Sequence, residues 1–196
     1  MNKTEQRRSV LRDRLVEIAE DVIERDGLNV LTARVLANRA ECSLGAIYNV
    51  FGDMHAIVET VNIRSFEKMR LFVIGEVSKN AELSAKEQLE EASVAYLNFA
   101  LQNTNLWNAI MDIEMAPIED FPKTYLEKTD ALFLIVESLL QKIYPTEDMS
   151  EVKCMARTMF GAVHGIVVLG TEERLLSVPQ EKLDGMVRWL IKRIID

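Results

Sequence analysis

The sequence predicts an all-α protein of about nine helices. Apolar residues recur at spacings of three and four along most of the chain, and no segment alternates apolar and polar residues as a strand does. Capping residues, glycines and prolines separate these apolar segments. The 196 residues suffice for one or two domains, each with its own core. The predicted helices cover residues 7–25, 32–40, 44–50, 54–79, 84–102, 105–115, 122–143, 149–174 and 180–195.

The first predicted helix, residues 7–25, has an apolar stripe at helical spacing. Gly27 is predicted to end it, because glycine readily adopts the backbone conformation that follows a helix C-terminus. The stripe consists of Leu11, Leu15, Ile18, Ala19, Val22 and Ile23.

Two short helices are predicted next, joined by a turn at Glu41 and Cys42. Thr32 and Ser43 are their N-caps, since each hydroxyl can accept a hydrogen bond from an unpaired backbone N–H of the first turn. Helices this short are not stable alone, so neighbouring elements must hold them. The residues predicted to face the core are Val35, Leu36, Ala37, Ala40, Ile47 and Phe51. Those predicted to face away are Leu44, Gly45, Ala46, Tyr48 and Asn49, a small and hydrogen-bonding surface that suits a DNA major groove.

The later helices are delimited by caps and prolines. Asp53 can cap the long helix over residues 54–79, and Ser84 can cap the next one. Pro117, Pro145 and Pro179 lie where later helices must stop or start, because proline cannot continue a helix from its interior.

Residues 7–60 resemble the DNA-binding part of the tetracycline-repressor (TetR) family of bacterial transcription regulators. The matching features are a first helix ending at Gly27, Thr32 before the helix-turn-helix, the pair Leu36-Ala37, and the run Ser43-Leu44-Gly45-Ala46-Ile47-Tyr48-Asn49-Val50-Phe51. Three positions depart from the family pattern. Glu41-Cys42 replaces Gly-Val in the turn, Val50 replaces a frequent His, and Met54 replaces a Lys that grips a phosphate.

The resemblance implies a helix-turn-helix DNA-binding domain over residues 1–52 and a helical ligand-binding and dimerisation domain over 53–196. It implies that Ser43, Gly45 and Tyr48 hold phosphates or sugars, while Leu44, Ala46 and Asn49 meet base edges. Asn49 is the best candidate for hydrogen bonding to a base, and Arg34 could reach either backbone or base. The complete set of expected DNA contacts is Thr32, Arg34, Ser43, Leu44, Gly45, Ala46, Tyr48 and Asn49.

The net charge of −8 is unevenly distributed. Residues 1–52 hold equal numbers of positive and negative side chains, so residues 53–196 carry the whole excess. Residues 1–14 hold five positive and two negative side chains, which suits an arm lying on phosphates. The alternative interpretation is a solvated helix start with scattered charges.

Residues 156–166 resemble a motif of one subgroup of the family, in which an aromatic residue, usually Trp, lies four residues before a His-Gly pair. Here Phe160 stands in the aromatic position and His164-Gly165 is intact. Met and aromatic side chains in this half suit an adaptable apolar pocket, and the alternative is ordinary core filling. His164 could equally be a core or interface residue, and Glu114 could orient a ligand or face water. The predicted ligand contacts are Phe66, Met69, Tyr96, Phe99, Trp107, Met111, Phe133, Met159, Phe160 and His164.

The last two helices are predicted to form a homodimer. Small residues on the first of them, Ala156, Gly161, Ala162, Gly165 and Gly170, would let two helices approach closely. The final helix carries an apolar stripe too wide for a surface helix, formed by Leu183, Met186, Val187, Leu190, Ile191 and Ile194. A two-fold dimer would read a palindromic operator.

The family resemblance favours a repressor controlled by a small hydrophobic ligand. The main alternative is a helical small-molecule binder that has lost DNA binding, which Met54, Glu41 and the neutral N-terminal part favour. An enzyme is disfavoured, because the chain has only two histidines, His55 and His164, and no phosphate loop or nucleophile with its base. No metal or cofactor is expected. The chain has no apolar run long enough to span a membrane and no secretory signal, so a cytoplasmic protein with reduced cysteines is expected.

Overall fold

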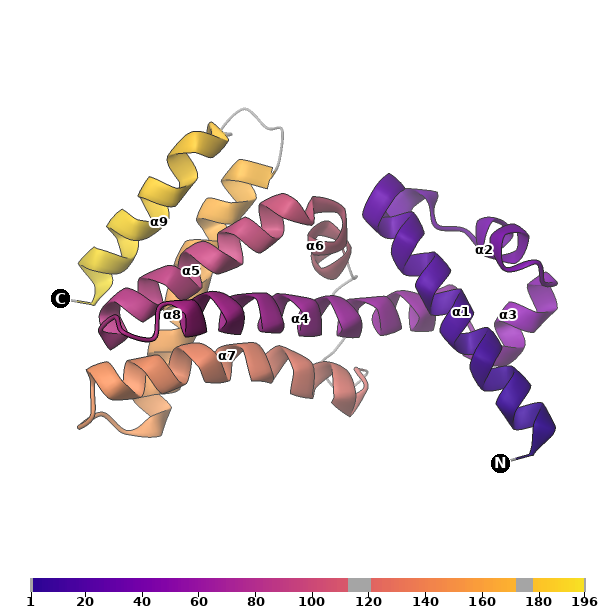
Figure 1. Cartoon of the computed structure of the whole chain (residues 1–196), viewed down its shortest axis with the longest axis horizontal. Coiled ribbons are helices and arrows are strands. Elements are labelled where there is room, and N and C mark those ends of the chain that lie inside the picture. Colours follow the sequence, from indigo (N-terminus) through magenta and orange to yellow (C-terminus); the bar gives the residue numbers. More distant parts are fainter. Residues whose placement is uncertain (1, 113–120, 172–177, 196) are drawn as a thin grey trace. The chain divides into compact units, whose positions relative to one another are not determined.

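The computed structural model describes residues 2–112, 121–171 and 178–195, and these form nine α-helices and one short 3₁₀ turn (Figure 1). The predicted all-α class is confirmed. Contacts divide the chain into two compact units, Met1–Ser65 with Asn103–Tyr125, and Phe66–Gln102 with Leu126–Asp196. The predicted functional boundary after residue 52 is a different kind of division and stays a prediction.

The helices of the first unit begin with α1 (Lys3–Asp26), the 3₁₀ turn η1 (Leu28–Val30), α2 (Ala33–Ala40) and α3 (Leu44–Phe51). The start of α1 lies four residues before the predicted one. Asn2 and Glu5 form a capping box there, in which the Asn2 side chain accepts from the Thr4 amide and Glu5 accepts from the Asn2 amide at 2.8 Å. These residues are exposed, so no apolar periodicity marked them.

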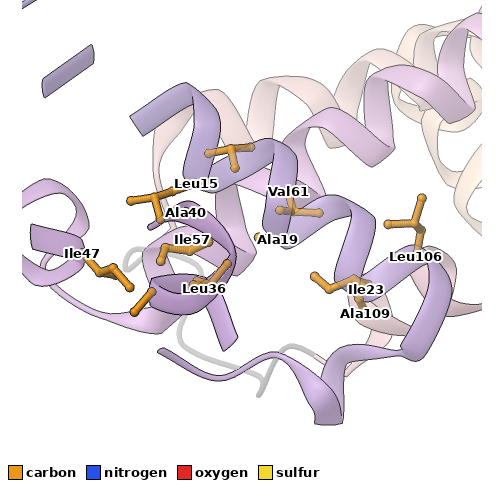
Figure 2. Close-up of a cluster of buried hydrophobic side chains, with 12 residues drawn as sticks. Leu15, Ala19, Ile23, Leu36, Ala40, Ile47, Ile57, Val61, Leu106 and Ala109 are labelled. Atoms are coloured by element: carbon orange, nitrogen blue, oxygen red, sulfur yellow. The ribbon is translucent and has the colours of Figure 1, made fainter. Parts of the chain in front are cut away.

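The core of the first unit gathers side chains from α1, α2, α3, the first part of α4 (Met54–Lys79) and α6 (Thr104–Met111) (Figure 2). Ile47 is the fully buried residue of α3, and it points toward the same cluster as Ile57 of α4. Burial of each such side chain contributes roughly 1.5–3 kcal/mol, which is how two helices of eight residues are held in place. The cluster labelled in Figure 2 consists of Leu15, Ala19, Ile23, Leu36, Ala40, Ile47, Ile57, Val61, Leu106 and Ala109.

The predicted caps of the middle helices are present. The Asp53 carboxylate accepts from the Ala56 amide at 2.8 Å at the start of α4. Ser84 and Glu87 form reciprocal hydrogen bonds before α5 (Ala85–Gln102), which holds the pKa of Glu87 below its usual range. The predicted helix over residues 105–115 is observed as α6, which starts one residue earlier and ends at Met111. Residues 113–115, including Glu114, lie outside the described residues.

The second unit is completed by α7 (Lys123–Ile143), α8 (Met149–Thr171) and α9 (Gln180–Ile194), although the first residues of α7 belong to the first unit. Residues 172–174 of the predicted α8 lie outside the described residues. Helix α9 packs against both α5 and α8, and α5 also packs against α8. Arg188 of α9 joins this arrangement by ion pairs to Glu90 at 3.0 Å and to Glu91.

Part of the surface predicted for dimerisation is used within the chain. Leu183, Val187 and Ile191, half of the apolar stripe of α9, are completely buried in the single chain. Gly170 lies so close to Leu183 that an added Cβ would overlap the leucine side chain. Half of the apolar stripe of α9 therefore serves to pack this helix against α5 and α8 within one chain.

Helix α8 is also the one described helix whose length and composition would allow it to cross a membrane. A single such helix is weak evidence, because a core helix of a globular protein passes the same test. In this chain α8 packs against α5 and α9.

Candidate functional site

The two short helices of the first unit are held by the caps that the sequence predicts. The Thr32 hydroxyl accepts from the Val35 amide at 3.2 Å, and the Ser43 hydroxyl accepts from the Ala46 amide at 3.2 Å. Between them Glu41 adopts a left-handed backbone conformation, with φ of 52°. This conformation lets the backbone reverse direction within the few residues that separate α2 from α3.

The outward face of α3 has the orientation that the sequence predicts. Ile47 has no exposed surface, while Leu44 and Tyr48 are 43% and 47% exposed. Gly45 and Asn49 are exposed as well, and Ala46 is half-buried. Helix α3 thus presents a hydroxyl, an amide and a small central surface to an approaching molecule.

Helix α1 contacts the C-terminal end of α3. The Arg8 guanidinium donates to the Val50 carbonyl at 3.5 Å, and the Arg12 guanidinium lies 4.8 Å from the centre of the Phe51 ring. Sequence reasoning missed these contacts. The spacing of four between the arginines places both on one face of α1, but local sequence does not show that α3 lies beside that face.

The cations of the first unit fall into two groups. Arg39 is paired with Asp21, and Arg64 pairs with Glu20 at 3.2 Å. Within residues 1–52, four exposed cations make no ion pair, side-chain hydrogen bond or cation–π contact with any residue that the structure describes, and these are Lys3, Arg7, Arg14 and Arg34. Three of them lie in the first half of α1, so the basic arm predicted from residues 1–14 has uncompensated charges.

The departures from the family pattern have a structural role. Cys42, Val50 and Met54 are partly buried and pack against the core of the first unit. Where the family pattern places a phosphate-gripping lysine, this chain therefore has an apolar side chain that contributes to the core. One cation of the expected DNA surface is absent as a result.

In the second unit, the aromatic and histidine residues of the predicted ligand site form one cluster. The Tyr96 hydroxyl lies 2.9 Å from His164 Nδ1, and the Phe160 ring stacks on His164 with centroids 5.2 Å apart. Phe133 meets Phe160 edge to face at 5.2 Å, and the Arg157 guanidinium lies 3.4 Å from the centre of the Phe133 ring. Burial lowers the pKa of His164 below its ordinary value, which favours the neutral imidazole.

The remaining predicted ligand residues divide between the two units. Phe66, Met69, Phe99 and Met159 are buried side chains of the second unit. Trp107 and Met111 lie on α6 in the first unit, where Trp107 is buried and Met111 is 39% exposed. Ligand contact by these residues stays a prediction.

A buried polar contact in the first unit was also missed. Asn62 of α4 has no exposed surface, and its side-chain amide donates to the Ala109 carbonyl of α6 at 2.9 Å. Nearby, burial raises the pKa of Tyr125, whose ring lies tilted by 32° against that of Phe121 with centroids 4.9 Å apart. An Asn at an apolar position of a long helix was the available sequence signal.

The described residues contain no group of three or more His, Cys, Asp or Glu side chains arranged to hold a metal ion. Cys42 and Cys154 are free thiols.

A family model described as "Tetracyclin repressor-like, C-terminal domain" matches residues 89–194. No curated protein matches the chain in sequence. Among solved structures, a protein of unknown function from Rhodococcus sp. RHA1 superposes with a TM-score of 0.76 at 22% identity, covering 94% of this chain and 93% of that one. A TetR transcriptional regulator from the same organism gives a TM-score of 0.68 at 17% identity, with 97% of each chain covered. The TetR-family regulator PfmR from Thermus thermophilus gives 0.62 at 17% identity, covering 93% of this chain and 97% of that one. These structural likenesses show a shared fold along nearly the full chain.

Proposed function

Because the chain belongs to the tetracycline repressor-like family of transcriptional regulators, we propose that it is a DNA-binding repressor whose operator affinity is modulated by a small hydrophobic ligand. The observation that supports this most strongly is the outward face of α3. Tyr48 and Asn49 are exposed there while Ile47 is fully buried, so a rigidly held helix offers hydrogen-bonding groups to solvent.

In the proposed complex, α3 enters the major groove of DNA. Asn49 hydrogen-bonds a base, and Leu44 and Ala46 contact neighbouring base edges. Ser43, Gly45 and Tyr48 hold the sugar-phosphate backbone, with Thr32 and Arg34 at the start of α2.

The N-terminal half of α1 supplies the phosphate attraction in this proposal. Lys3, Arg7 and Arg14 are exposed and have no carboxylate partner among the described residues. They offset the loss of the family's lysine, whose position is taken by the core-packing Met54. Attraction of this kind is independent of sequence and weakens as salt rises.

We further propose that α8 and α9 form a two-fold dimer interface. An added Cβ at Gly161 or Gly165 would meet no described atom of another element within 4 Å, which leaves this face of α8 available to a second copy. Trp189 of α9 is 64% exposed, which is typical of a residue that anchors an interface. A two-fold dimer presents two copies of α3 to a palindromic operator.

The ligand would act through the aromatic cluster around His164. Helix α4 contributes residues to both units, so a ligand that favours one arrangement of the second unit can bias the first. Operator affinity then changes only as far as the ligand prefers one dimer geometry over the other. Membership of the subgroup with the aromatic and His-Gly motif is part of this proposal.

The direct test is a footprint and gel shift at low salt on DNA upstream of the chain's own gene. We expect protection of a palindromic site by the wild-type protein and loss of that protection in Asn49→Ala. Arg25→Ala is the matched control, because Arg25 lies 3.8 Å from Asp21 and is distant in sequence from the proposed contacts. Absence of any protected site would contradict DNA recognition.

The alternative is a helical small-molecule binder of the same fold that has lost DNA binding. Three observations favour it, namely the apolar Met54, the acidic Glu41 in the turn and the zero net charge of residues 1–52. A thermal-shift screen with small hydrophobic compounds, combined with the gel shift, distinguishes the repressor from this alternative. The alternative predicts a ligand-induced rise in melting temperature without any DNA shift at low salt.

A further inference from the structure

Among the described glutamates of the second unit, two are more than nine-tenths buried, and they differ in their surroundings. Glu90, 8% exposed, forms ion pairs with Arg188 at 3.0 Å and Lys192 at 3.5 Å. Glu137, 7% exposed, makes neither a hydrogen bond nor an ion pair with any described residue. Burying a carboxylate without a partner is costly, because the group loses its hydration and gains nothing in return. Glu137 is therefore a nearly buried side chain whose carboxylate keeps some contact with solvent and has no counter-charge among the described residues.

Glu137 lies on the inward face of α7, four residues after the buried Phe133 and three before the buried Leu140. It also lines an open groove of about 560 Å³ between α7 and the start of α8. The other groove residues are Leu134, Ser138, Gln141, Lys142, Met149 and Lys153. A volume of this size accommodates a small organic molecule.

The same groove exposes two large apolar side chains. Leu134 is 60% exposed and Met149 is 49% exposed, one from each helix. Both lose unfavourable contact with water if an apolar molecule covers them. The groove thus combines an apolar surface with a nearly buried acid.

Two lysines also line the groove. Lys142 and Lys153 are exposed, and neither forms an ion pair with Glu137. Their charges are hydrated and screened by salt, so they act on a ligand more weakly than the largely buried carboxylate of Glu137 does. They disfavour a ligand with several positive charges. A negatively charged ligand would leave Glu137 unpaired and add repulsion to it.

We propose that the α7–α8 groove binds a small amphipathic cation, with its single ammonium group paired to Glu137 and its apolar body covering Leu134 and Met149. The ammonium donates a charge-assisted hydrogen bond to the carboxylate, which offsets the cost of burying both groups. This site is separate from the aromatic cluster around His164, and it does not depend on whether the chain binds DNA.

The test is calorimetric titration of the full-length protein with three probes of one chain length, octylamine, 1-octanol and octanoate, at neutral pH. We expect octylamine to bind at least roughly tenfold more tightly than 1-octanol, since a hydrogen bond to a charged group is worth about that factor. Equal binding of the amine and the alcohol overturns the proposal, and so does the absence of amine binding. This comparison uses the wild-type protein and needs no variant to fold.

Variants locate the site. Glu137→Gln should reduce octylamine affinity about tenfold and leave 1-octanol affinity unchanged. Glu127→Gln, an exposed glutamate of the same helix, is the matched control and should change neither. Lys153→Gln should leave amine affinity equal or higher. If octanoate binds best and Lys153→Gln abolishes that binding, the groove is an anion site and the proposal is wrong.

Discussion

Glu41 carries the backbone reversal between α2 and α3 in a conformation that few non-glycine residues adopt. Its φ of 52° lies in the left-handed region, which costs a residue with a Cβ roughly 1–2 kcal/mol. Glycine avoids that cost, although it gains freedom in the unfolded chain. The family pattern places glycine in this turn for a reason that this structure makes visible.

We predict that Glu41→Gly raises the free energy of unfolding by roughly 0.5–1 kcal/mol. Urea denaturation followed by circular dichroism at one protein concentration measures this. Asn38→Gly, at an exposed helical position of α2, is the control and should lower stability instead. A loss of stability in Glu41→Gly would show that the carboxylate makes a compensating interaction.

Neighbouring residues of α3 should separate folding from recognition. Asn49→Ala removes an exposed amide, and we expect it to weaken operator binding by roughly 1–3 kcal/mol with little effect on stability. Ile47→Ala opens a cavity in the core and should reduce the free energy of unfolding by roughly 2–5 kcal/mol. Gel-shift titration and urea denaturation of both variants test this contrast, and similar effects of the two on stability would contradict it.

His164 should make stability depend on pH. Burial lowers its pKa in the folded chain, so below its ordinary value of 6.5 the unfolded chain binds a proton that the folded chain resists. Protonation would also prevent His164 Nδ1 from accepting a hydrogen bond from the Tyr96 hydroxyl. The stability that neutral His164 contributes is therefore fully present above pH 6.5, and it is lost as the pH falls below that value.

We expect the wild-type protein to lose more stability than His164→Gln when the pH is lowered from about 7.5 to 5.5. Urea denaturation at both pH values gives the comparison, and carboxylates that titrate in this range affect both proteins alike. Parallel losses in the two proteins would mean that His164 titrates as it does in the unfolded chain.

At the scale of elements, the glycines of α8 serve two different contacts. Gly170 allows the close approach of Leu183 from α9, whereas Gly161 and Gly165 border open space. Leu183 is fully buried and cannot move aside easily. The same residue type therefore supports packing within the chain at one position and leaves a free face at two others.

We predict that Gly170→Ala lowers stability by roughly 1–3 kcal/mol through overpacking. Gly165→Ala should keep or raise the stability of the helix, because alanine has the higher helix propensity.

If α8 forms the proposed dimer interface, Gly165→Leu should shift the molecule toward monomers. Sedimentation at several protein concentrations detects that shift, and an unchanged association state would place the interface elsewhere.

At the scale of the whole molecule, the charge distribution determines how the protein meets DNA. The net charge of −8 resides in residues 53–196, and residues 1–52 are neutral. Ion pairs such as Arg39 with Asp21 neutralise part of the first unit and leave the start of α1 positive. In the proposed complex, the attraction to phosphates is consequently concentrated in a few side chains.

We expect Arg7→Gln to reduce the slope of log affinity against log salt by about 2 for a dimer, since each protomer loses one phosphate contact. Arg25→Gln should leave the slope unchanged, because that arginine lies beside Asp21. Operator titrations over a range of salt concentrations measure both slopes. An unchanged slope in Arg7→Gln would remove this residue from the phosphate surface.

Sequence reasoning succeeded where the information is local. Thr32, Ser43 and Asp53 cap helices as predicted, because a cap depends on residues two or three positions away. The exposed face of α3 follows from helical periodicity in the same way. The early start of α1 was missed because its first residues are exposed and carry no apolar period.

Residue types and their spacing were enough to establish the all-α class, the order of the helices and which side of α3 faces the core. The packing of the helices, by contrast, places Arg12 over Phe51, brings Tyr96 to His164, and leaves Glu137 nearly buried without a partner among the described residues. Caps and periodicity act within a turn or two of helix, whereas these contacts join residues far apart in the chain. Their geometry depends on how whole helices pack, which no local pattern records.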